Sequence, residues 1–136
     1  MEINLPDVVA EVSDEFARYE QALLANDIRA LNDFFWHDAC ALRYSVAGTQ
    51  HGHAEIAASR LARSTRDIAR QLFATVITTF GRDVATANTE FRRTESGRLG
   101  RQSQTWVRFP EGWRVVAAHV SYAASIDPQP NQWGNP

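Results

Sequence analysis

The sequence predicts an α+β domain with a cone-like fold, in which three N-terminal helices pack on a curved antiparallel sheet and enclose a pocket. Apolar residues recur every three or four positions early in the chain, as in helices, and alternate from about residue 70 on, as in strands. The later strands are separated by short, turn-like links such as GRD and PEG, which favour antiparallel neighbours. We expect one domain over residues 1–126, followed by an irregular tail over residues 127–136.

Two helices are predicted by apolar spacing at the start of the chain. The segment PDVVAEVSDEFARYEQALLAN carries one apolar stripe, and Pro6 suits its first turn. Asp27 can cap a second, shorter helix over DIRALNDFFW. The residues expected to face the interior are Val9, Val12, Phe16, Tyr19 and Leu23 in the first helix and Ile28, Leu31, Phe34 and Phe35 in the second.

The segment ALRYSV, residues 41–46, reads as a short strand with two unlike faces. Leu42, Tyr44 and Val46 alternate onto one face, which we expect to be the core face. Arg43 shares the other face with small neighbours, so that face looks either at water or into a cavity where an anion sits. The next residues, AGTQHG, indicate a turn or loop, and HAEIAASRLARS indicates a third short helix. Four strands follow: RQLFATVITTF, DVATANTEFRR, RQSQTWVRF and WRVVAAHVSYA.

Composition limits the classes of function. The net charge of −2 gives no positive footprint for nucleic acid or an anionic membrane. With one cysteine, no signal peptide and no apolar run long enough to span a membrane, we expect a soluble cytoplasmic protein. The four histidines lack ligand spacing, and glycine-rich phosphate loops and Ser-His-Asp patterns are missing from the sequence. We therefore expect neither a metal nor a cofactor.

Tyr19 and Arg43 are the first candidate site residues. Tyr19 lies on the apolar stripe of the first helix, so its hydroxyl needs a partner inside the protein. It is either a core tyrosine or a pocket tyrosine that donates a proton or hydrogen bond to a ligand. Arg43 is either solvated or part of a pocket wall.

The third helix offers two further arginines, and the expected strand RQSQTWVRF offers polar candidates. Arg60 and Arg63 share a stripe with Ile56, whereas the competing register turns Leu61 inward and leaves both arginines in water. Arginines from two elements that converge on a cavity would indicate a ligand that carries carboxylates. Gln104 and Trp106 share one strand face, which suits a polar pocket or a dimer surface.

Four segments resemble a known family: FARYEQALLANDIRALNDFFW, LRYS, TFGRDVATANTEFRR and GRQSQTWVR..EGWRVVAAHVS. They are similar to the AtzH-like family, which includes the HpxZ proteins of oxalurate catabolism and belongs to the SnoaL-like, nuclear-transport-factor-two-like (NTF2-like) superfamily. The resemblance extends over the chain to about Ser121. It implies the same cone-shaped α+β fold.

The resemblance also implies an activity. The member that names the family is a decarboxylating amidohydrolase that uses no metal, acts on 1,3-dicarboxyurea and yields allophanate. Its essential tyrosine and arginine correspond to Tyr19 in RYEQAL and Arg43 in LRYS. We expect Arg60, Arg63, Gln104 and Trp106 to bind the substrate. This sequence departs from the family pattern at Ser45, where glycine is usual, and at Ser59, where phenylalanine is usual.

Two alternatives and one assembly state complete the expectations. The protein could instead be a non-catalytic module that binds a dianion or assists a larger amidase, or a structural dimer with a vestigial cavity. Strands such as TWVRF and VVAAHVS are apolar on both faces, which is typical of a sheet that packs on the core and on a second subunit. We therefore expect a homodimer that takes a small dicarboxylate.

Overall fold

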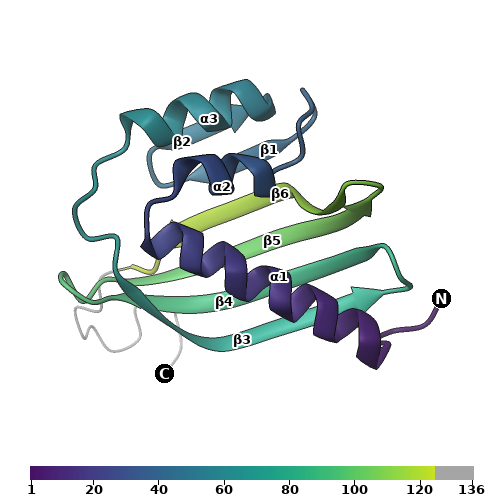
Figure 1. The fold of residues 1–136 in the computed structure, drawn as a ribbon. Coiled ribbons are helices and arrows are strands. Elements are labelled where there is room, and N and C mark those ends of the chain that lie inside the picture. The colour runs from purple at the N-terminus through teal and green to yellow at the C-terminus, as the bar shows by residue number, and fades with distance from the viewer. Residues whose placement is uncertain (125–136) are drawn as a thin grey trace, which may run out of the picture.

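A computed structural model describes residues 1–124, and the expected tail, residues 127–136, lies outside them. Figure 1 shows the three helices on one face of a single twisted sheet, as predicted. The elements in chain order are α1 (Pro6–Leu24), α2 (Ile28–Phe34), β1 (Leu42–Ser45), β2 (Gly48–His51), α3 (Gly52–Ala62), β3 (Arg70–Phe80), β4 (Val84–Arg93), β5 (Leu99–Phe109) and β6 (Gly112–Tyr122). The α+β class and the packing of helices on a curved sheet are confirmed.

The sheet has six strands in the order β2-β1-β6-β5-β4-β3. Strands β3 to β6 form the predicted antiparallel meander. β1 lies parallel to β6, with Arg43 beside Ala118, so the sheet as a whole is mixed. A parallel pair needs a long connection, and α3 with β3 to β5 supplies it.

The segment expected to be a turn or loop contains a strand. β2 pairs with β1 from Ser45–Gly48 to Leu42–His51, which leaves only Val46 and Ala47 as the hairpin loop. Residues 48–51 do not alternate between apolar and polar side chains. Such alternation is not needed there, because β2 is a short, largely exposed edge strand. Pairing with β1 therefore decides its structure.

Two bulges bend the sheet. In β3, Ala74 and Thr75 both lie opposite Thr89, and Ala74 takes a φ of 53°. At this bulge, the hydroxyl groups of Thr75 and Thr89 form a hydrogen bond of 2.8 Å. A second irregularity lies where Trp106 of β5 pairs with β6. Such bulges increase the local twist and let the strands curve around the helices.

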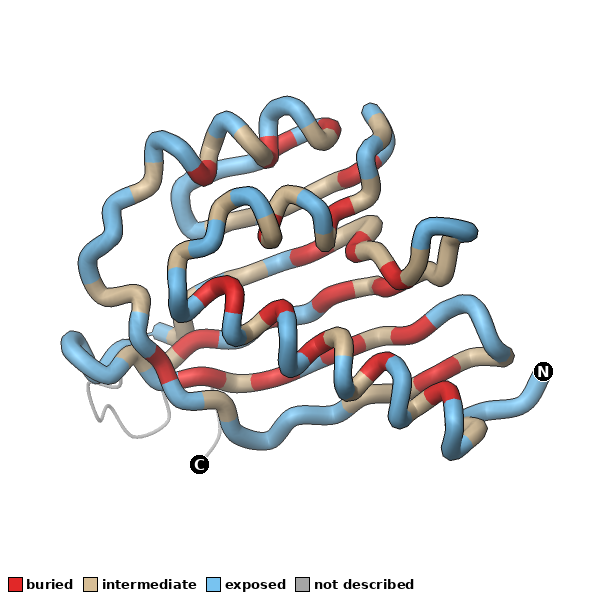
Figure 2. Tube along the Cα trace, in the orientation of Figure 1, coloured by how far each residue is buried: buried red, intermediate tan, exposed pale blue. Residues whose placement is uncertain are grey.

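The core lies between the helices and the sheet, and Figure 2 shows the buried positions gathered there. The stripe of α1 begins at Val8, which is fully buried, whereas Val9 is only partly buried. α2 ends before the predicted boundary because Phe35 is extended and bridges Val115 of β6. Ile28, at the start of α2, is partly rather than fully buried.

The face of β1 that we expected to be the core face lies on the open side of the sheet. Tyr44 is 43% and Val46 57% exposed, whereas Ala41, before the strand on the other face, is 1% exposed. Arg43 therefore points toward the helices. The expectation was wrong because α3 packs over the face with the small residues, which leave room for a long guanidinium side chain.

Within residues 1–124, no helix is both long enough and apolar enough to cross a membrane.

Candidate active site

Tyr19 is a buried tyrosine of α1 whose ring lies in an aromatic cluster. It is 4% exposed, and its ring meets Phe34 and Trp106 edge-on, with centroids 5.7 and 6.1 Å away. The apolar stripe of α1 turns it toward the sheet, as the spacing predicts. Packing on three sides fixes the direction of its hydroxyl.

Arg43 reaches from β1 into the space under α3. Its Nη1 donates to Ser59 Oγ at 3.3 Å and to Gln50 Oε1 at 3.5 Å, the outer limit of a hydrogen bond. Burial lowers the pKa of Arg43 to about 10; Tyr19 opposes the shift, and the positive charges of Arg60 and Arg63 add to it. Arg43 therefore remains a cation at neutral pH, held in place by neutral partners.

Arg60 shows which register α3 adopts. Ile56 is fully buried and Arg60 only 2% exposed, whereas Leu61 is 76% exposed. The two alternatives that the sequence left open are thus decided in favour of inward arginines. The Arg60 guanidinium carbon lies 5.0 Å from the centroid of the Phe35 ring. Its Nε, Nη1 and Nη2 are buried and have no hydrogen-bond partner among the described residues.

The arginines change the acidity of Tyr19. Burial alone would raise the pKa of the Tyr19 hydroxyl, but the charges of Arg60, Arg43 and Arg70 together outweigh it and lower this pKa. The Arg60 guanidinium is also near enough to act as a donor toward the hydroxyl, although the two groups do not form a hydrogen bond of ordinary geometry. A phenolate at Tyr19 would therefore be stabilised by the surrounding cations.

Arg63 follows the last turn of α3 and points back toward the end of α1. Its Nη2 donates to Asn26 Oδ1 at 2.6 Å, and its Nε is buried with no partner among residues 1–124. Burial lowers the pKa of Arg63, and the charge of Arg60 lowers it further. Both arginines of the α3 stripe thus lie near Tyr19, but only Arg63 has a polar partner in the structure.

A pocket of about 390 Å³ opens next to these residues. It lies between the β1–β2 hairpin, the end of α3 and the ends of β4 and β6. Four arginines and one acid, Asp67, line it together with small and apolar residues. The arginines are Arg43, Arg63, Arg66 and Arg93.

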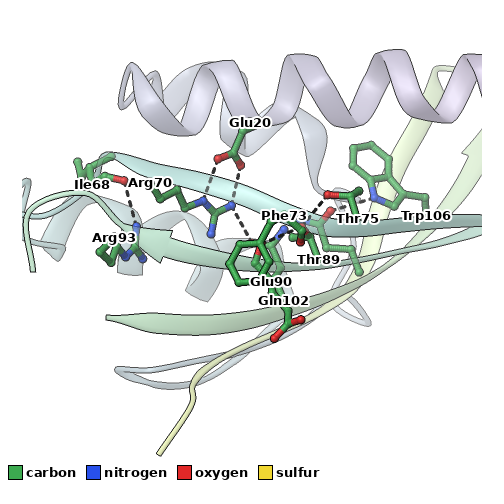
Figure 3. Close-up of polar contacts among 11 residues, drawn as sticks. Glu20, Ile68, Arg70, Phe73, Thr75, Thr89, Glu90, Arg93, Gln102 and Trp106 are labelled. Carbon is green, nitrogen blue, oxygen red and sulfur yellow. Dashed lines mark hydrogen bonds and ion pairs between the residues drawn. The ribbon is translucent and has the colours of Figure 1, made fainter. Parts of the chain in front are cut away.

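Arg70 is a nearby buried arginine whose charge is neutralised by an ion pair within the protein. Arg70 donates from Nε and Nη2 to the two Glu20 carboxylate oxygens at 2.9 and 2.6 Å, and from Nη2 to Gln102 Oε1 at 3.0 Å (Figure 3). Its side chain is 1% exposed. Arg70 is therefore compensated within the fold, unlike Arg60.

Gln104 and Trp106 share one face of β5, as their spacing predicts, and the structure shows that this is the inner face. Trp106 is fully buried, and its Nε1 donates to Gln104 Oε1 at 3.0 Å. The indole forms the wall behind Tyr19, and neither residue lines the pocket beside Arg43. A role for them in substrate binding stays a prediction.

Several residues that line the pocket or contact Arg43 escaped the sequence reasoning. Gln50 lies in the segment expected to be a loop, and Arg66 lies between predicted elements. Arg93 could have been found, because it alternates with buried Phe91 on the same strand face. His119, in contrast, is exposed on the open face of the sheet beside Tyr44, away from the pocket.

The described residues contain no group of three or more His, Cys, Asp or Glu side chains placed to hold a metal ion. The candidate site consists instead of one tyrosine, three arginines and neutral polar groups. Such a set can bind anions and exchange one proton.

Comparisons with known proteins agree with this architecture. The model of the AtzH-like family matches residues 1–125. The chain is similar to a protein of unknown function from the DUF3225 family of Pectobacterium atrosepticum SCRI1043, with 52% identity, 90% of this chain and 95% of that chain covered, and a TM-score of 0.87. It is also similar to a cystatin-like fold protein of Burkholderia xenovorans LB400, with 49% identity, 91% and 98% of the two chains covered, and a TM-score of 0.87.

A more distant likeness concerns the fold alone. An NTF2-like superfamily protein of Salmonella enterica has 22% identity, 90% and 97% of the two chains covered, and a TM-score of 0.70. No curated protein matches the chain.

Proposed function

Because this chain belongs to the AtzH-like family, we propose that it is a small decarboxylating amidohydrolase that acts on an N-carboxylated urea, such as 1,3-dicarboxyurea. Its place would be in the breakdown of urea derivatives or oxalurate. The observation that supports the proposal most is the unpaired, buried guanidinium of Arg60 beside Tyr19 and Arg43. A buried cation without a partner is costly, and a bound anion would compensate it.

The substrate would be held through its negative charges. Arg43, with Arg60 or Arg63, would bind the carboxylate that the product retains. Ser59 and Gln50 would keep the Arg43 fork in position through their hydrogen bonds. Positioning and charge stabilisation in a site with little water would supply most of the rate.

Tyr19 would act as the proton donor. The bond between nitrogen and the second carboxylate breaks, carbon dioxide leaves, and the electron pair stays on nitrogen. The nitrogen takes the Tyr19 hydroxyl proton, and allophanate results. The phenolate, stabilised by Arg60 and Arg43, then regains a proton from water, which closes the cycle.

Turnover of 1,3-dicarboxyurea by single variants tests these roles. We expect Tyr19→Phe to lower kcat by about 100- to 10,000-fold, the usual range for lost proton transfer. Arg43→Ala should mainly raise KM. Tyr44→Phe is the matched control, because Tyr44 is exposed on the open face of the sheet, and it should keep full activity. Full turnover in both Tyr19→Phe and Arg43→Ala would refute the assignment.

The same variants separate catalysis from binding alone. If malonate raises the Tm of the wild type and of Tyr19→Phe but no preparation turns over dicarboxyurea, the protein is a dianion-binding or accessory module instead.

We also propose that two copies pair through the open face of the sheet. Tyr44, Phe73, Val76 and Val84 are exposed there, each at least 39%. A second copy would cover these side chains, which water otherwise contacts. Light scattering should give twice the mass of one chain, and a monomeric mass at micromolar concentration would refute the pairing.

A further inference from the structure

Positive charge is concentrated at one place on an otherwise acidic protein. The chain has a net charge of −2, yet Arg43, Arg63, Arg66 and Arg93 line the same pocket and Arg60 lies behind it. None of these five forms an ion pair with a described residue. Asp67, the one acid of the lining, accepts a hydrogen bond from the Ser96 amide at 3.2 Å. The pocket therefore carries more positive charge than one small carboxylate would neutralise.

The arginines form two groups at different depths along the sheet. Arg43 lies beside Ala118 of β6, and Arg93 donates from Nε to the hydroxyl of Tyr122 at 3.3 Å. Tyr122 follows Ala118 by four residues, so the two places are roughly 13 Å apart along the strand, at about 3.3 Å per residue. Arg63 also lines the pocket, and its Nη2 donates to Asn26 Oδ1 at 2.6 Å.

The outer group is held in place at the mouth of the pocket. The Arg93 Nη1 donates to the carbonyl of Ile68 at 3.0 Å (Figure 3), and its guanidinium carbon lies 4.9 Å from the centroid of the Phe91 ring. Arg66 is exposed at the same rim. Apolar side chains also line the pocket, namely Leu23, Ile68 and Val120.

This distribution does not suit a short dianion alone. The carboxylates of malonate or dicarboxyurea are separated by a few bonds, so a molecule bound at Arg43 leaves Arg66 and Arg93 without an anionic partner. A span of roughly 13 Å between the two backbone positions corresponds to about ten carbon–carbon bonds of an extended chain, and the flexible arginine side chains allow a shorter ligand to reach both groups.

We propose that the pocket binds an elongated ligand with an anionic group at each end. The inner anion lies at Arg43, the lining arginine that is near Tyr19 and Arg60, and the distal anion lies at Arg66 and Arg93. The middle of the ligand packs on the apolar lining. The inference rests on the proposed function in one respect, namely that the end of the ligand at Arg43 is the end that reacts. The substrate is then an N-carboxylated amide or urea whose other end is also anionic.

Calorimetric titration of the full chain with three probes tests the distal site. The probes are malonate, suberate and octanoate, a short dianion, a long dianion and a long monoanion. We expect the wild type to bind suberate more tightly than octanoate, because only suberate has a distal carboxylate. Arg66→Gln should weaken suberate binding by about five- to tenfold, the effect of one lost charge-assisted contact, and change malonate binding by less than twofold.

A control variant and three contrary results complete the test of the distal site. Arg29→Gln removes an exposed arginine of α2 and should change neither affinity. The proposal is overturned if the wild type binds suberate no more tightly than octanoate. It is overturned equally if Arg66→Gln weakens malonate and suberate by one factor, or weakens neither. Malonate binding that survives Arg43→Ala would instead count against the proposed function, whatever suberate does.

Discussion

The replacement Arg60→Met is expected to stabilise the free protein and abolish its response to anions. Methionine is long, flexible and apolar, so it can fill the space of the Arg60 side chain on the Phe35 ring. The replacement removes a buried charge, and it also removes the repulsion between Arg60 and its two neighbours, Arg43 and Arg63. Stability and binding should therefore change in opposite directions.

The magnitude follows from the contacts of the guanidinium. Its three nitrogens are buried without partners, and an unsatisfied buried polar group costs about 1–3 kcal/mol, more when charged. The contact with Phe35 returns about 2 kcal/mol, the size found for desolvated pairs. Exchanging buried charges for well-packed apolar side chains gains about 1–4 kcal/mol where it has been measured, and we expect Arg60→Met to fall in that range.

Urea unfolding with and without malonate measures both effects. Malonate at one hundred times its Kd should stabilise the wild type by about 2.7 kcal/mol and leave Arg60→Met unchanged. Arg29→Met is the matched control, since Arg29 is exposed on α2 and should shift the free energy of unfolding by less than about 0.5 kcal/mol. If Arg60→Met lost more than about 1 kcal/mol of stability, or kept the malonate response, the reasoning from an unpaired cation would be refuted.

Three further predictions concern the surroundings of the site. Glu20→Ala should cost about 3–5 kcal/mol in urea unfolding because it leaves Arg70 charged and buried, whereas Arg82→Ala breaks an exposed pair and should cost less than about 1 kcal/mol; similar costs for the two would contradict this. The pKa of Tyr19 is lowered from 10.0, so its ionisation adds stability that is complete above pH 10 and is lost as the pH falls through the lowered pKa. Ultraviolet titration should show one phenolate forming below pH 10. The same titration curve in Tyr19→Phe would disprove this. A Cβ at Gly100 would clash with the Phe91 ring, so Gly100→Ala should lower the free energy of unfolding by about 1–3 kcal/mol. An unchanged Tm would count against that packing.

The regular elements could be predicted because each shows its own period. The stripe of α1 places Tyr19 inward without reference to any other element, and alternation in β3 to β6 predicts a meander with short links. That Gln104 and Trp106 share one strand face also follows from alternation alone. Local spacing is sufficient in these cases because it determines which side chains share a face.

Spacing does not say which of two faces another element covers. In β1, Leu42 and Tyr44 form the more apolar face, yet the packing of α3 shows that the face with Arg43 is the inner one. The sequence likewise left two registers open for α3 and slightly favoured the one with Leu61 inward, whereas the packing of α3 against β1 and β2 buries Arg60 instead. β2 needed its pairing partner before it could be recognised as a strand.

Taken by itself, the sequence determined the helix–sheet class, the inward turn of Tyr19 and the set of arginines available for a site. The tertiary structure decided how those arginines are paired. Arg70 meets Glu20 across fifty residues of chain and is neutralised, whereas Arg60 meets no carboxylate among the described residues. Charge compensation depends on distance in space, and residues far apart in the chain come within that distance only when the helices and the sheet pack together.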